Sequence, residues 1–154
     1  KLAGEGAARA YSADHGIASA GFRPLIVYGP GRETGMTAAP SLACRAAARG
    51  EDAVIPFSGE TDFVYVTDVA AAFAEAAATQ IEGAHVYNIT GESTTAEAFA
   101  LAVERAAPGV TITAAGPLLP IAPGMDGASL RRDFPTVPLT TVADGIARTI
   151  AFYR

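Results

Sequence analysis

The most informative segment of this sequence is Arg23-Pro24-Leu25-Ile26-Val27-Tyr28-Gly29-Pro30-Gly31-Arg32. With Phe22 just before it, the segment gives residues 18–28 a nearly continuous apolar run. Such a run is typical of a strand buried on both faces, as in a parallel sheet. We therefore predict one strand over residues 18–28, which ends in a loop at Gly29-Pro30-Gly31.

Helical and extended patterns alternate on both sides of that strand. The helical patterns cover residues 1–15, 37–49, 69–78, 94–107, 128–133 and 141–153, and the extended ones cover 54–57, 62–66, 85–89 and 110–114. This alternation predicts an α/β fold. A strand as apolar as residues 18–28 needs further sheet beside it, so we expect an incomplete parallel sheet. Because the helix at Lys1 begins without a cap or a lead-in, we expect the chain to be a piece of a longer one.

Charge and composition exclude several classes of function. The 154 residues carry a net charge of −5, and the 11 Lys and Arg residues are scattered singly, which argues against a nucleic-acid partner. The apolar runs are too short to cross a membrane. Cys44 is the single cysteine, so we predict neither a disulfide framework nor a metal site. A reduced, cytoplasmic setting fits this composition best.

Four motifs together resemble the extended short-chain dehydrogenase/reductases, the NAD-dependent epimerase/dehydratase family. They are the segment 23–32, the strand-to-helix stretch Asp62–Val69, the stretch Val86–Gly91 with the helix after it, and the closing stretch Pro138–Ile150. The resemblance covers residues 1–154. It implies the C-terminal part of a Rossmann-like fold with a small substrate-binding subdomain, without the N-terminal dinucleotide-binding half.

This resemblance implies a catalytic role for Lys1. The family's active site is Tyr-x-x-x-Lys, which implies that Lys1 is the catalytic lysine and that its tyrosine lies four residues before this chain. The ammonium would lower the proton affinity of the phenol and bind the cofactor ribose. Pro24 and Leu25 would lie against the nicotinamide of NAD or NADP. The alternatives are a solvated lysine and a simple strand bend at Pro24.

The predicted substrate-binding residues depart from the family's nucleotide-sugar enzymes. Ile26 stands where those enzymes have an asparagine, and Thr61 where they have a phosphate-binding arginine. Arg32 could replace the lost charge or merely hold its own loop, and Tyr28 could form the pocket floor or be a core aromatic. Because a diphosphate needs charged donors, we expect a smaller hydroxyl or keto substrate instead of a typical nucleotide-sugar.

Some polar residues receive structural interpretations. Thr67 or Asp68 would cap the helix at 69–78, Asn88 would bond a loop, and Cys44 would fill a buried helix face. A capping box at Thr94-Thr95-Ala96-Glu97 would open the helix after it.

Two functions are compatible with this sequence. The first is the substrate-binding part of an NAD(P)-dependent epimerase, dehydratase or dehydrogenase, inactive without its N-terminal half or a complementary chain. The alternative is a non-catalytic ligand-binding or assembly module derived from that family. In both cases the resemblance implies a homodimer formed through the helix that begins at Lys1.

Overall fold

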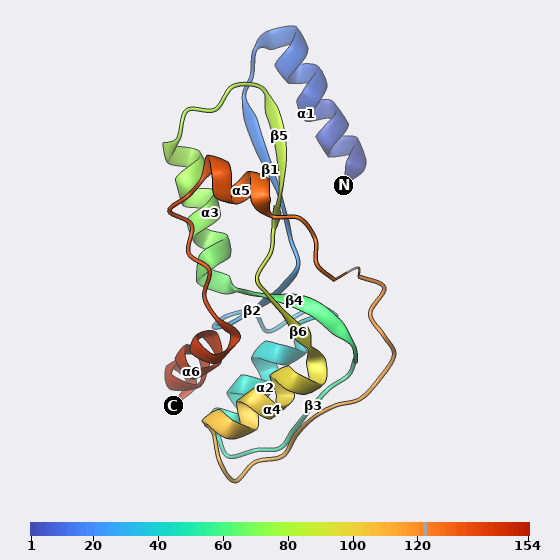
Figure 1. Ribbon diagram of the computed structural model, residues 1–154, viewed down its shortest axis with the longest axis vertical. Coiled ribbons are helices and arrows are strands. Elements are labelled where there is room, and N and C mark those ends of the chain that lie inside the picture. Colours follow the sequence, from blue (N-terminus) through green and yellow to red (C-terminus); the bar gives the residue numbers. More distant parts are fainter. Residues whose placement is uncertain (122) are drawn as a thin grey trace.

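The computed structural model describes residues 1–121 and 123–154, in which helices and strands alternate (Figure 1). The helices are α1 (Leu2–His15), α2 (Ala39–Ala48), α3 (Val66–Ala78), α4 (Ala96–Ala106), α5 (Ala128–Asp133) and α6 (Val142–Tyr153). The strands are β1 (Ser19–Pro24), β2 (Ile26–Tyr28), β3 (Ala53–Ile55), β4 (Glu60–Tyr65), β5 (Ala84–Ile89), β6 (Glu92–Thr95) and β7 (Ile112–Ala114). The α/β fold class predicted from the sequence is confirmed.

The strands form three small sheets. β1 pairs in parallel with β5, from Ser19 opposite Ala84 to Pro24 opposite Ile89. β4 lies between β2, its parallel neighbour, and β6, its antiparallel neighbour, while β3 and β7 form a parallel pair. Within residues 1–121 and 123–154, β1 has no strand on its other edge. The parallel sheet is therefore incomplete, as expected.

The single strand predicted over residues 18–28 is in fact two strands in two sheets. The chain leaves β5 at Leu25, whose N–H donates to the Ile89 carbonyl at 3.2 Å, and then pairs with β4. The predicted burial on both faces is wrong for β1, whose residues are half-buried or exposed. It is right for Ile26 and Tyr28 of β2. β1 is less buried than predicted because one of its edges has no neighbouring strand among the described residues. In addition, one of its faces is covered only by α1, and a cleft separates the two (Figure 1).

Two groups of buried side chains hold the elements together. The larger lies among α2, α4, α6 and the sheet of β2 and β4, and its bulky members include Tyr28, Phe63, Phe99, Ile26, Ile55 and Ile146. The smaller joins β4 and β5 to α3 and α5 and consists of Val64, Ala72, Tyr87, Ile89, Leu130 and Phe134. Figure 1 shows α3 and α1 on opposite sides of the β1–β5 pair. Since α1 contains no buried residue, it covers its side only loosely.

Threonine caps begin two of the helices. Thr141 accepts a hydrogen bond from the Asp144 N–H at 3.1 Å and caps α6, as predicted. Thr95 accepts from the Ala98 N–H at 3.1 Å and caps α4, one residue later than the predicted capping box places it. The shift arises because β6 pairs with β4 as far as Thr95, so Thr94 is still inside the strand and the helix begins after Thr95.

Asp68 is not the helix cap that the sequence predicts. α3 already begins at Val66, where no side chain caps it. The Asp68 carboxylate instead accepts two hydrogen bonds of 2.7 Å, from the N–H and the hydroxyl of Thr140. Because Asp68 is only 3% exposed, it is a buried tether between α3 and the segment before α6.

Removing this tether is expected to destabilise the protein. Asp68→Ala leaves the Thr140 N–H and hydroxyl without their acceptor in a buried place, which costs about 2–3 kcal/mol of unfolding free energy. Guanidinium unfolding, followed by circular dichroism, measures the loss. The exposed Asp14→Ala on α1 is the control and should change stability by less than about 0.5 kcal/mol. Equal stability of the two variants would contradict a tethering role.

Candidate functional site

An open cleft lies between α1 and the β1–β5 pair. Its volume is about 700 Å³. The first three turns of α1 line one wall, and β1 with the first half of β5 lines the other. The lining residues are Lys1, Gly4, Glu5, Ala8 and Arg9 from α1, residues 19–24 from β1, and residues 84–86 from β5. The site predicted around Lys1 is therefore an open cleft.

Lys1 stands at the start of α1, where its carbonyl accepts the N–H groups of Gly4 and Glu5 at 3.0 and 3.3 Å. Residues four apart on a helix share a face, and Lys1 and Glu5 both line the cleft. Pro24, at the end of β1, lines it too. The structure thus brings together Lys1 and Pro24, two of the three residues predicted to bind the cofactor. Leu25, the third, is half-buried and packs against the smaller core group.

An ion pair that the sequence reasoning missed crosses this cleft. Arg23 Nε donates to Glu5 Oε1 at 2.7 Å, and its terminal nitrogen donates to Glu5 Oε2 at 2.5 Å. The hydrogen bond from Arg23 lowers the pKa of Glu5, and the same bond raises the pKa of Arg23. No local signal predicts this pair, because its members lie 18 positions apart and on different elements.

Two predicted substrate residues lie in the core and do not line this cleft. Ile26 is 1% exposed and Tyr28 0% exposed, both within the larger core group. The Tyr28 hydroxyl donates to the carbonyls of Thr141 and Val142 at 3.4 Å, and burial raises the pKa of Tyr28. The geometry matches the alternative for Tyr28, a core aromatic with its hydroxyl bonded to the start of α6.

Arg32 and Thr61 lie away from the cleft as well. Arg32, in the loop after β2, donates to the Thr34 carbonyl and to Thr37 Oγ1, so it holds its own loop. Thr61 sits on β4, is 2% exposed, and its hydroxyl has no hydrogen-bond partner among the described residues. The same is true of Oδ1 of the adjacent Asp62. Binding by Arg32 or Thr61 stays a prediction.

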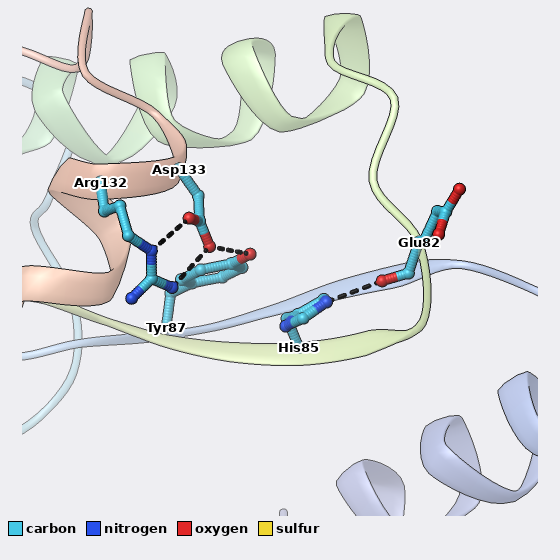
Figure 2. A network of polar contacts seen from close by, with 5 residues as sticks. All are labelled: Glu82, His85, Tyr87, Arg132 and Asp133. Atoms are coloured by element: carbon cyan, nitrogen blue, oxygen red, sulfur yellow. Dashed lines mark hydrogen bonds and ion pairs between the residues drawn. The ribbon is translucent and has the colours of Figure 1, made fainter.

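β5 also carries a second group of polar contacts, shown in Figure 2. Tyr87 donates to Asp133 Oδ2 at 3.0 Å, and Arg132 Nε donates to Asp133 Oδ1 at 2.8 Å. The bond from Arg132 lowers the pKa of Asp133, and burial raises the pKa of Tyr87. His85 Nε2 lies 2.7 Å from the carbonyl of Glu82, which can only accept, so Nε2 carries the proton. The Tyr87–Asp133 bond fastens α5 to β5, and the His85–Glu82 contact holds the turn before β5.

Other sequence interpretations can be compared with the structure directly. Cys44 is fully buried in α2, as predicted, and burial raises the pKa of its thiol to about 12. The Asn88 amide donates to the Asp126 carbonyl at 3.0 Å, the expected loop bond. Among the described residues, no group of three His, Cys, Asp or Glu side chains is placed to hold a metal ion. None of the helices described is long and apolar enough to cross a membrane.

Comparison with known proteins places this geometry in a family. The model of the NAD dependent epimerase/dehydratase family matches residues 1–90. No curated protein matches the chain.

Solved structures share the fold along almost the whole chain. The UDP-N-acetylglucosamine 4-epimerase of Bacillus cereus is 20% identical, with a TM-score of 0.80 over 99% of this chain and 54% of its own. The L-threonine dehydrogenase of Cupriavidus necator is 22% identical, with a TM-score of 0.80 over 99% and 59%. The UDP-glucose 4-epimerase of Thermus thermophilus, solved with NAD, is 26% identical, with a TM-score of 0.76 over 100% and 52%.

The chain thus spans little more than half the length of these solved proteins. Their likeness confirms a partial Rossmann-like fold. Because the family model matches more than half of the residues, including Lys1, the cleft wall of β1 and the start of β5, the chain belongs to the NAD dependent epimerase/dehydratase family.

Proposed function

We propose that this chain is the C-terminal, substrate-binding part of an NAD(P)-dependent oxidoreductase of the epimerase/dehydratase type. One observation carries the proposal: Lys1 and Pro24 line the same open cleft in a chain of this family. The free edge of β1 supports a second element of the proposal, that the N-terminal dinucleotide-binding half completes the sheet there.

Lys1 would act through a phenol. In the proposed arrangement, the family's tyrosine lies one helical turn before Lys1, outside this chain, and so on the same face of the helix. A nearby ammonium favours the ionised phenolate and lowers the pKa of the phenol. The phenol can then exchange a proton with a substrate hydroxyl or carbonyl near neutral pH.

The residues that line the cleft fit one end of the cofactor. The Lys1 ammonium offers hydrogen-bond donors suited to ribose hydroxyls, and Pro24 offers an apolar ring against which a flat nicotinamide can pack. When bound, NAD(P) accepts or returns a hydride. The described residues contain no glycine-rich dinucleotide fingerprint, so the pyrophosphate would be bound by the N-terminal half.

The substrate is proposed to be a small hydroxyl or keto compound. Thr61, at the position where the family's nucleotide-sugar enzymes carry an arginine, brings a hydroxyl and no charge. Arg32 is engaged with Thr34 and Thr37 of its own loop. Charge-assisted hydrogen bonds supply much of the affinity for a diphosphate, and these residues supply few. The L-threonine dehydrogenase among the similar structures shows that the fold also serves a substrate other than a nucleotide-sugar.

A titration of the natural polypeptide, which means the protein as the cell produces it, tests this proposal. NADH and NADPH are added separately and followed by fluorescence. Then small hydroxy compounds and UDP-sugars are each supplied with NAD⁺ and NADP⁺, and absorbance of the reduced nicotinamide is recorded. The proposal expects cofactor binding, and reduction with a small hydroxy compound in preference to UDP-sugars. Ligand binding without cofactor binding would instead support a non-catalytic module.

The same sample tests the proposed homodimer. α1 has no buried residue, and its Leu2 and Tyr11 side chains are 75% and 58% exposed. Exposed apolar side chains on a loosely packed helix are typical of an interface, so α1 is proposed to pair with α1 of a second copy. Sedimentation should give a dimer, and a monomer at micromolar concentration would contradict the pairing.

A further inference from the structure

The Glu5–Arg23 ion pair joins α1 to β1 across the cleft. Both carboxylate oxygens of Glu5 accept from the guanidinium, at 2.7 and 2.5 Å. The Glu5 side chain is 17% exposed, although its partner is 46% exposed. A bidentate ion pair fixes the relative orientation of its two side chains as well as their distance. It therefore joins the first turns of α1 to the end of β1 in one orientation.

α1 has little else to hold it there. It contains no buried residue, and no side chain caps its first turn. Most helices in proteins owe their stability to an apolar face packed against the core. The place of the first turn of α1 therefore depends on the Glu5–Arg23 pair.

The pair also decides what Glu5 does to Lys1. Residues four apart on a helix readily form an ion pair, so an unpaired Glu5 would attract the Lys1 ammonium. Here both oxygens of Glu5 are taken by Arg23. In the described residues Lys1 forms no ion pair. The guanidinium of Arg23 neutralises the charge of Glu5 and so weakens its attraction for the Lys1 ammonium.

We propose that Glu5 and Arg23 are positioning residues that anchor the first turn of α1 and leave the Lys1 ammonium available to the cleft. The inference rests on the proposed function of Lys1. Neither residue is assigned a contact with substrate. Arg23 has two effects, as an anchor for α1 and as the group that neutralises Glu5, and substitutions can separate them.

The test compares Arg23→Gln, Glu5→Gln and the double variant Glu5→Gln/Arg23→Gln in the natural polypeptide. Lys1 availability is measured as the rate of its acetylation by acetic anhydride, read on its peptide by mass spectrometry. Arg23→Gln frees Glu5 to pair with Lys1, which engages the amine in an ion pair and should slow acetylation about two- to threefold. The double variant removes the competing carboxylate and should restore the wild-type rate.

Two further readouts separate positioning from stability. Affinity for NADH should fall about threefold in Arg23→Gln and recover in part in the double variant. Amide exchange in Leu2–Arg9 should accelerate in all three variants, because each breaks the anchor. Arg132→Gln, which breaks the exposed Arg132–Asp133 pair on α5, is the matched control and should change none of these quantities.

The outcomes are distinct for the two proposals. If the three variants give equal acetylation rates and equal NADH affinities, the pair is a structural contact only and the inference is overturned. If the wild-type polypeptide binds neither NADH nor NADPH, but acetylation of Lys1 follows the expected order, the positioning role stands and the proposed function fails.

Discussion

Methionine in place of Lys1 is expected to lower kcat of the natural polypeptide on the order of 100-fold or more, as loss of a proton-transfer group does. Without the ammonium, the pKa of the partner phenol returns towards about 10, so at neutral pH only about one phenol in a thousand is ionised. The pH–rate profile should therefore move to higher pH in Lys1→Met, and raising the pH should recover part of the lost rate. Steady-state kinetics over a pH series measures both effects.

Arg9→Met is the matched control for this prediction. Arg9 also belongs to α1 and lines the same cleft, so its replacement removes one positive charge from the same wall. Its expected effect on kcat is less than about threefold, as for an exposed charge outside the proton-transfer step. Equal kcat values for wild type and Lys1→Met would show that the lysine does not serve the reaction.

Alanine in place of Gly91 is expected to destabilise the protein strongly. A Cβ at Gly91 would lie 1.8 Å from the Phe63 carbonyl oxygen, 2.6 Å from its carbon and 3.0 Å from Val64 Cα. These are backbone atoms of β4, the strand that pairs with β2 and β6, so they cannot rotate away. Overpacking against such atoms costs about 3 kcal/mol or more of unfolding free energy, which denaturant titration measures.

Gly6→Ala provides the opposite expectation. A Cβ at Gly6 meets no atom within 4 Å, and the residue lies inside α1. Because alanine is the better helix former, this variant should be more stable by about 0.5–1 kcal/mol. If Gly91→Ala proved as stable as Gly6→Ala, the close crossing of the β5–β6 connection over β4 would be refuted.

Local patterns predicted most of the elements and their order. α1 ends at Gly16 in the left-handed conformation with φ 67°, and α6 begins at its Thr141 cap; both signals lie within a few residues. Such local signals do not determine which strands pair with each other. The break at Leu25 occurs because the chain exchanges β5 for β4 as its neighbour. β6 was missed because its pairing with β4 overrides the helix-start pattern of Thr94.

The candidate site, too, could be predicted only in part from the sequence. The juxtaposition of Lys1 and Pro24 follows from the family resemblance, and the structure places both on one cleft. The Glu5–Arg23 pair could not be read from either local segment, since it exists only after α1 folds back along β1. Tyr28 looks the same in sequence whether it faces a ligand or the core, and its contacts with α6 distinguish the two.

The most direct measurement is a structure of the natural polypeptide with NAD bound. We expect Lys1 Nζ within hydrogen-bond distance of a ribose hydroxyl, beside a tyrosine phenol one helical turn earlier, with Pro24 against the nicotinamide. A cofactor bound elsewhere, with the Lys1 amine directed into solvent, would contradict the proposed role of this chain.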